Sequence, residues 1–260
     1  MVKSRIIPFL GEKYSSAFFN AAVRYQKILA KEGILVLPDF INKVGLKKIV
    51  QEADNLKSSS FQSVSEYNVY VMPTDPDQSM NSARNRIMKT TKKCISNDLI
   101  ASDSLLMDVY NDPTIKAFFA TLFGVAALFP YADPLSSVNI NYYDRGDALG
   151  WHFDNSDFTI TLLAKNCTKG GLYQYHTDMR YKRDGSENFE LVESILDENT
   201  VAETQKAQAG DLMVFRGNKS LHQVTEVIEG ERILITFNYN IKKGISLSEE
   251  SRRTFFGRIT

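Results

Sequence analysis

Three residues have the types and the spacing of a metal-binding site. His152 and Asp154 are two positions apart, and His222 follows about 70 residues later. Residues at i and i+2 of an extended segment project to the same side, so His152 and Asp154 can hold one ion together. Two imidazoles and one carboxylate are the protein ligands of facial iron(II) sites, which leave coordination positions open. The spacing therefore predicts an iron site with His152, Asp154 and His222 as its metal-binding and catalytic residues.

The histidines also allow a simpler interpretation. The chain has 3 histidines, and a histidine on a strand is more often a core or surface residue than a metal ligand. His176 is best explained as a surface or hydrogen-bonding residue, because the ligand set is complete without it. The residues around the His-x-Asp pair are therefore needed to distinguish a metal site from ordinary core or surface histidines.

Three further residues have the chemistry to bind a dicarboxylate. Arg232 follows His222 by ten positions and opens an apolar run, and a buried arginine needs a partner. Its planar guanidinium matches a carboxylate in bidentate fashion, such as the distal carboxylate of 2-oxoglutarate. Asn141 and Tyr143 share one face of a candidate strand, 138–143, and can hydrogen-bond the same molecule. The ordinary alternative for Asn141 and Tyr143 is a polar and an aromatic residue at a strand edge.

Several motifs together resemble the iron(II)/2-oxoglutarate-dependent oxygenases. They are Asn-x-Tyr-x-x-Gly before His-x-Asp, the Gly-Asp pair at 210–211 that leads into a strand, and His222 followed by Arg232. More narrowly, residues 146–154 and 215–225 are similar to the BesD-like radical halogenases and hydroxylases of free amino acids, notably lysine. This narrower resemblance covers residues 135–241. It implies iron(II) as cofactor and 2-oxoglutarate and dioxygen as cosubstrates.

One position separates the two chemistries of the group that the chain resembles. Its halogenases carry a small residue at the carboxylate position, so that chloride can take the vacated place on iron. This chain has Asp154, which implies hydroxylation of an unactivated C–H bond in a free amino acid, with L-lysine as the best single candidate. Two alternatives remain open: an oxygenase acting on a protein or an alkylated nucleic acid, and a non-catalytic jelly roll that binds 2-oxoglutarate.

Five polar or aromatic residues are candidates for contact with the substrate: Arg86, Trp151, Asn155, Asp157 and Asn238. An arginine in a lid before the barrel suits a substrate carboxylate, and Asp157 can pair with a terminal ammonium. Asn238 shares its alternate-strand parity with Arg232. Packing beside the iron is the expected role of Trp151. Turn formation or a hydrogen bond at a strand start explains Asn155 and Asp157 equally well.

Composition indicates an ordinary enzyme. The 31 basic and 31 acidic residues balance, so no global field attracts nucleic acid or anionic lipid, and a small-molecule substrate is favoured. No apolar run is long enough to span a membrane. Cys94 and Cys167 have no motif spacing, and the N-terminus lacks a signal-like segment. We expect a reducing cytoplasm, and the sequence leaves the oligomeric state open.

The pattern of elements changes along the chain. Helical periodicity marks 13–31, the stretch after Asn42, and 113–124, with a strand at 34–40. Short runs separated by turn signals follow, at 158–163, 171–175, 201–205, 212–215, 221–227 and 233–239. This order predicts a double-stranded β-helix, a cupin-like jelly roll, with a helical N-terminal buttress. We expect one domain over 1–260: helical support to about 130, a jelly-roll core at about 131–241 and a C-terminal tail at 242–260.

Overall fold

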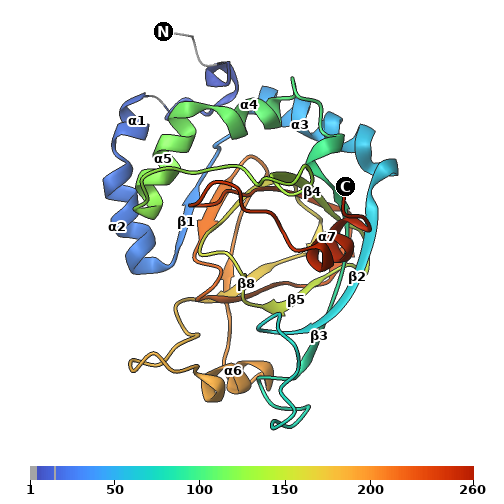
Figure 1. Ribbon diagram of the computed structural model, residues 1–260. Coiled ribbons are helices and arrows are strands. Elements are labelled where there is room, and N and C mark those ends of the chain that lie inside the picture. Colours follow the sequence, from blue (N-terminus) through green and yellow to red (C-terminus); the bar gives the residue numbers. More distant parts are fainter. Residues whose placement is uncertain (1–4, 15) are drawn as a thin grey trace.

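Two antiparallel sheets form the centre of the protein in the computed structural model, which describes residues 5–14 and 16–260 (Figure 1). The larger sheet has the order β1 (Ile34–Leu37), β10 (Leu212–Phe215), β6 (Thr159–Lys165), β13 (Arg232–Phe237), β4 (Val138–Tyr143), β3 (Ile87–Ile95) and β2 (Phe61–Asn68). The smaller has the order β5 (Leu149–His152), β11 (Leu221–Val224), β8 (Tyr173–His176) and β9 (Glu203–Gln205). The fold is thus the predicted jelly roll, completed by the ribbon of β12 (Val227–Glu229) and β7 (Lys169–Gly170).

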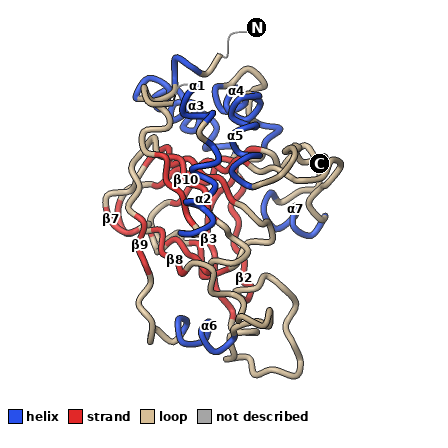
Figure 2. Tube along the Cα trace, turned by 90° about the vertical axis from the view of Figure 1, so that its left-hand side faces the viewer, coloured by secondary structure: helices blue, strands red, loops and turns tan. Residues whose placement is uncertain are grey.

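The helices cover the strands from outside. They are α1 (Ser16–Asn20), α2 (Ala22–Glu32), α3 (Lys43–Leu56), α4 (Leu105–Asn111), α5 (Pro113–Phe123), α6 (Phe189–Leu196) and α7 (Glu249–Phe256), with 3-10 turns at Ile7–Phe9, Lys57–Ser59 and Asn97–Leu99. Figure 2 shows α1, α3 and α4 at one end of the strands and α6 at the other. None of the described helices is long and apolar enough to cross a membrane.

Local capping sets the helix ends that the sequence predicted. The Asn42 side chain accepts hydrogen bonds from the backbone N–H groups of Val44 and Gly45, both at 3.0 Å, and so starts α3. Gly33 ends α2 with φ 71°, a left-handed conformation that glycine adopts without steric cost. The helix expected over 13–31 is instead divided into α1 and α2 at Ala21, where the backbone makes a turn.

The central strands divide their side chains between an apolar core and a polar interior. On β4, Ile140 and Tyr142 belong to the main core cluster that also contains residues of α1 to α5. The alternate residues Asn139, Asn141 and Tyr143 line a cavity instead. Because side chains alternate between the two faces of a strand, helices α1 to α5 pack on one face of the large sheet, and the other face lines the cavity.

Two regions contribute more than the sequence predicted. The stretch expected as helical support contains β1, where a strand was predicted at 34–40, and it also supplies β2 and β3, which were not predicted. The segment expected as a C-terminal tail contains α7, which packs against β2 and β3. Ser63 Oγ of β2 donates a hydrogen bond to the Thr254 carbonyl at 2.8 Å, and Arg258 forms an ion pair with Asp98 at 2.7 Å. These contacts fix α7 on the sheet.

Candidate metal centre and its cavity

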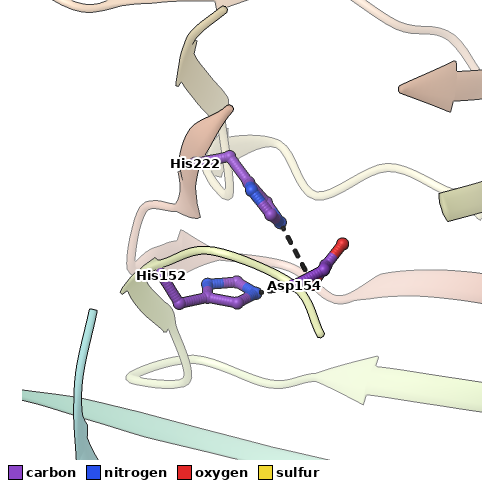
Figure 3. Close-up of side chains that lie close together, drawn as sticks. All are labelled: His152, Asp154 and His222. Atoms are coloured by element: carbon purple, nitrogen blue, oxygen red, sulfur yellow. Dashed lines mark ion pairs between the residues drawn. The ribbon is translucent and has the colours of Figure 1, made fainter. Parts of the chain in front are cut away.

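The three predicted ligands meet at one point of the small sheet. His152 ends β5 and lies opposite His222 in the antiparallel pairing with β11, while Asp154 follows in the loop. The Asp154 Oδ1 atom is 3.3 Å from His152 Nε2 and 3.6 Å from His222 Nε2 (Figure 3). Ligand atoms from all three residues lie within 4.8 Å of one another, as a shared metal ion requires. His152 and Asp154 therefore project to the same side of the segment, as their i, i+2 spacing predicts.

Backbone carbonyls orient both imidazoles. His152 Nδ1 is 2.8 Å from the Gly150 carbonyl oxygen, and His222 Nδ1 is 2.9 Å from that of Ser220. With Nδ1–H as the donor, each Nε2 keeps a free lone pair toward Asp154, the arrangement typical of metal-binding histidines. Burial, assisted by the neighbouring His152, lowers the pKa of His222 to about 4. His222 is therefore neutral near pH 7, the form that binds metal.

Asp154 is held by two residues that the sequence did not reveal as functional. Burial would raise the pKa of this carboxyl, but His222, His152 and a hydrogen bond from Thr159 Oγ1 keep it below its ordinary value. Thr159 binds Oδ2, which leaves Oδ1 facing the imidazoles. A Cβ atom at Gly217 would lie 2.0 Å from Oδ2, so only glycine leaves room for this carboxylate. Neither residue stands out by spacing or periodicity.

Arg232 supplies the test of whether the cavity fits 2-oxoglutarate. It starts β13, is 3% exposed, and lines the same cavity of about 260 Å³ as the triad. Its Nε and Nη1 atoms have no hydrogen-bond partner among the described residues. Burial lowers the pKa of Arg232, with Tyr143 acting in the opposite direction. A buried guanidinium with free donors fits an anionic ligand, because an unpaired buried charge is costly.

Asn141 and Tyr143 line the cavity beside Arg232, as expected for contacts to the same ligand. Tyr143 is the register partner of Arg232 on the adjacent strand. The Asn141 side chain accepts a hydrogen bond from Lys92 Nζ at 2.8 Å and donates one to the Leu234 carbonyl at 3.4 Å. The contact of each residue with the cosubstrate remains a proposal.

The five candidate substrate contacts separate into two groups. Asn155 and Asn238 line the cavity, although Asn238 uses its Nδ2 for a hydrogen bond to the Ser136 carbonyl at 2.7 Å. Arg86, Trp151 and Asp157 are not among the lining residues that the structure describes.

Each residue outside the cavity has a local partner. The Arg86 guanidinium forms an ion pair with Asp197 at 2.6 Å, just beyond α6. Trp151 is on the strand position before His152 and packs near His176, with ring centroids 6.0 Å apart. Asp157 is exposed and accepts a hydrogen bond from Asn218 at 2.5 Å. This arrangement gives no support for their contact with a substrate.

The cavity also has walls that sequence reasoning missed. Residues of α7 and the segment before it line it, namely Leu247, Ser251, Phe255 and Phe256. Lys92 of β3 adds a cation, and it lies on the same face of the strand as the buried Thr90 and Cys94. The spacing of two residues from Thr90 and from Cys94 is the one signal in the sequence that places Lys92 on the inward face of the strand.

Comparison with solved structures agrees with this fold at low sequence identity. An oxidoreductase of the 2OG-Fe(II) oxygenase family from Burkholderia pseudomallei is 14% identical, with a TM-score of 0.53 over 92% of this chain and 96% of that one. The non-haem α-ketoglutarate-dependent epimerase SnoN from nogalamycin biosynthesis is 13% identical, with a TM-score of 0.56 over 85% and 83%. A Pseudomonas putida prolyl-4-hydroxylase is 16% identical, with a TM-score of 0.50 over 84% and 98%.

Fold and ligand set thus define an enzyme of the iron(II)/2-oxoglutarate oxygenase class, whose cofactor is iron(II) and whose cosubstrates are 2-oxoglutarate and dioxygen. Within it, the chain belongs to the Halogenase D family, whose model matches residues 20–256. No curated protein matches the chain significantly.

Proposed function

We propose that the protein hydroxylates a free amino acid at an unactivated C–H bond, using iron(II), 2-oxoglutarate and dioxygen. The observation that carries this proposal is the carboxylate of Asp154. It lies within 3.3 Å and 3.6 Å of the two imidazole Nε2 atoms, where it completes a three-residue ligand set. A site that exchanges this ligand for chloride needs a small side chain there, so a chain with Asp154 favours oxygen transfer.

Each part of the site has a distinct task in this reaction. Bound iron with its cosubstrates supplies the oxidising power to break an unactivated C–H bond. His152, Asp154 and His222 hold the metal, and the carbonyl-bonded Nδ1 atoms keep both imidazoles in the required tautomer. The free donors of Arg232 anchor the distal carboxylate of 2-oxoglutarate deep in the cavity. The remaining walls orient one C–H bond of the substrate, and that orientation sets which carbon reacts.

A free amino acid suits the size and lining of the cavity. Its volume of about 260 Å³ has to hold both the cosubstrate and the substrate, which favours a small molecule over a peptide. The side chains of Asn139, Asn238 and Thr236 offer polar contacts along its inner face. Lysine in particular is suggested by the sequence resemblance alone.

Chlorination is the second candidate, because the matching family model is that of a halogenase. The two candidates differ in the fate of the same C–H bond. Hydroxylation adds one oxygen to the substrate, whereas chlorination replaces one hydrogen with chlorine. A single mass measurement in chloride buffer therefore separates them.

The test uses the full chain loaded anaerobically with iron(II) and 2-oxoglutarate. Oxygen is admitted with each proteinogenic amino acid singly, in buffer with and without chloride, and succinate and substrate mass are followed. One added oxygen coupled to succinate is the expected result. Loss of both products in His222→Ala is the matched control. Succinate without any modified amino acid would refute the free amino acid as substrate, and a chlorinated product would establish the second candidate.

A further inference from the structure

Lys92 places a second cation in the cavity, in addition to Arg232. Its ammonium is 2.8 Å from Asn141 Oδ1, a neutral acceptor, and 6.0 Å from the ring centre of Phe255 on α7. Among the described residues, no carboxylate lies within ion-pair distance of it, whereas the next residue, Lys93, pairs with Asp144. Lys92 is half-buried, so its charge is only partly compensated by water.

The charges that line the cavity do not cancel. Among the described lining residues, Asp154 is the single carboxylate, and Lys92 and Arg232 are the two permanent cations. Asp154 faces the two imidazoles with which it would hold the metal, and Arg232 has free donors for the cosubstrate. Lys92 therefore remains as a positive charge without an assigned counter-charge.

One strand, β4, lies between the strands that carry Lys92 and Arg232. Arg232 on β13 pairs with Tyr143 on β4, and Lys93 on β3 pairs with Tyr142. Arg232, Tyr143 and Lys92 thus form one row across three strands, which places the Cα atoms of the two cationic residues two strand spacings apart, roughly 10 Å. Lys92 lies on the side where α7 packs against β2 and β3. Its ammonium lies between Asn141 of β4 and the Phe255 ring of α7.

We propose that Lys92 binds the carboxylate of the substrate and that the cavity selects carboxylic acids without a second positive charge. This inference rests on the proposed function for the amino acid class, and it disfavours lysine. A side-chain ammonium would meet no free carboxylate among the lining residues that the structure describes. The α-ammonium of a neutral amino acid finds neutral oxygen acceptors instead, such as Asn139 and Tyr131.

The experiment compares four probes by calorimetric titration of the anaerobic protein with iron(II) and 2-oxoglutarate bound. Norleucine shares the four-carbon side chain of lysine and lacks its ammonium, norleucinamide lacks the carboxylate, and hexanoate lacks the amino group. The variants are Lys92→Met, Lys92→Arg, which keeps the charge, and Lys89→Met, an exposed control on the same strand. Thermal unfolding checks that each variant is folded, and the Kd of 2-oxoglutarate is measured in each.

We expect norleucine to bind about tenfold more tightly than norleucinamide, which lacks the charge-assisted contact with Lys92. We expect a similar preference over lysine, because its side-chain ammonium would be buried without a carboxylate. Lys92→Met should remove the preference for carboxylate over amide, Lys92→Arg should retain most of it, and Lys89→Met should retain all of it. The Kd of 2-oxoglutarate should change less than about twofold in Lys92→Met; a tenfold rise would assign Lys92 to the cosubstrate and overturn the proposal.

The free amino acid and the carboxylate site can fail separately. If hexanoate binds in a Lys92-dependent manner and no amino acid binds or reacts, the carboxylate site stands and the proposed amino acid substrate fails. If lysine binds more tightly than norleucine, or if no probe distinguishes carboxylate from amide, the inference about Lys92 is wrong even when an amino acid is hydroxylated.

Discussion

His152 and His222 lie directly opposite each other on β5 and β11, and each bonds its Nδ1 to the carbonyl oxygen two residues before it. The two ligands are therefore oriented in the same manner from two separate strands. Their ring centres are 4.2 Å apart, and the pairing has an irregularity immediately after His222. A metal ion bound here would join the two strands at the point where their backbone pairing is least regular.

Metal binding should consequently stabilise the fold. Iron(II) at about 100 times its Kd adds roughly 2.7 kcal/mol to the free energy of unfolding. For a chain of this size we expect the Tm to rise by about 5–10 °C under anaerobic conditions. Differential scanning calorimetry with and without iron(II) measures this rise, and amide exchange should slow in β5 and β11. An equal rise in His222→Ala would show that the metal stabilises the protein from another site.

Asp154→Gly should abolish hydroxylation, because it removes the only carboxylate among the described lining residues of the cavity. The space left beside the two imidazoles is suited to an anion. Product mass in chloride and chloride-free buffer measures both effects. Asp157→Asn, at an exposed position three residues later, is the control that should keep full activity. Full hydroxylation by Asp154→Gly would remove Asp154 from the ligand set.

Arg232→Met should raise the Kd of 2-oxoglutarate roughly 100-fold, about 2.7 kcal/mol for a lost bidentate ionic contact. The free guanidinium donors of Arg232 make no hydrogen bonds that folding depends on, so the variant should remain folded. Titration calorimetry with 2-oxoglutarate gives the Kd, and Arg145→Met, at an exposed position, is the comparison. Unchanged affinity in Arg232→Met would defeat the assignment.

Thr159→Val should weaken iron binding about 10- to 100-fold, as loss of a hydrogen bond to a metal-ligand side chain commonly does. The substitution keeps the shape of the side chain and removes the hydroxyl that donates to Asp154 Oδ2. Thr159→Ser retains the hydroxyl and should bind iron like the wild type. Iron(II) titration with a competing chelator measures the affinities, and equal weakening in both variants would point to packing instead.

Phe255→Ala should reduce the coupling of succinate formation to substrate oxidation. Phe255 lines the cavity from α7, and its truncation admits water and loosens the substrate. The ratio of oxidised substrate to succinate should fall, while the Kd of 2-oxoglutarate stays within about twofold of the wild type. Arg253→Ala, an exposed residue of the same helix, should leave the ratio unchanged. A preserved ratio in Phe255→Ala would show that α7 does not seal the reaction.

Local patterns predicted the strands of the jelly roll and the His152–Asp154 pair because both depend on short-range rules, whereas His222 joins the pair through the pairing of β5 with β11. Alternation along β4 and β13 marks inward and outward residues, and the i, i+2 spacing places His152 beside Asp154. The i, i+2 rule says nothing of tertiary contacts between separate segments. The contacts of Thr159 and Gly217 with Asp154 are of this kind.

The missed part of the cavity wall has a similar cause. α7 is a short polar helix, and its place over the cavity depends on contacts far away in sequence, such as Arg258 with Asp98. Arg86 was expected near the substrate from its residue type, but its ion pair with Asp197 is decided by the position of α6. Residue type shows which bonds a side chain can form, and the fold decides which it does form.

Because Gly217 lies so close to Asp154, a substitution at position 217 is tolerated only after position 154 has changed. While the carboxylate is present, a methyl group at 217 would overlap Oδ2, so Gly217→Ala alone is damaging. Once residue 154 is glycine, the Cβ atom and the carboxylate are both absent, and position 217 is free to vary. A lineage that exchanged the carboxylate for chloride would thus lose a constraint on its neighbour. A change at Gly217 would then block return to the oxygen-transferring form, so that a single contact makes the change of chemistry difficult to reverse.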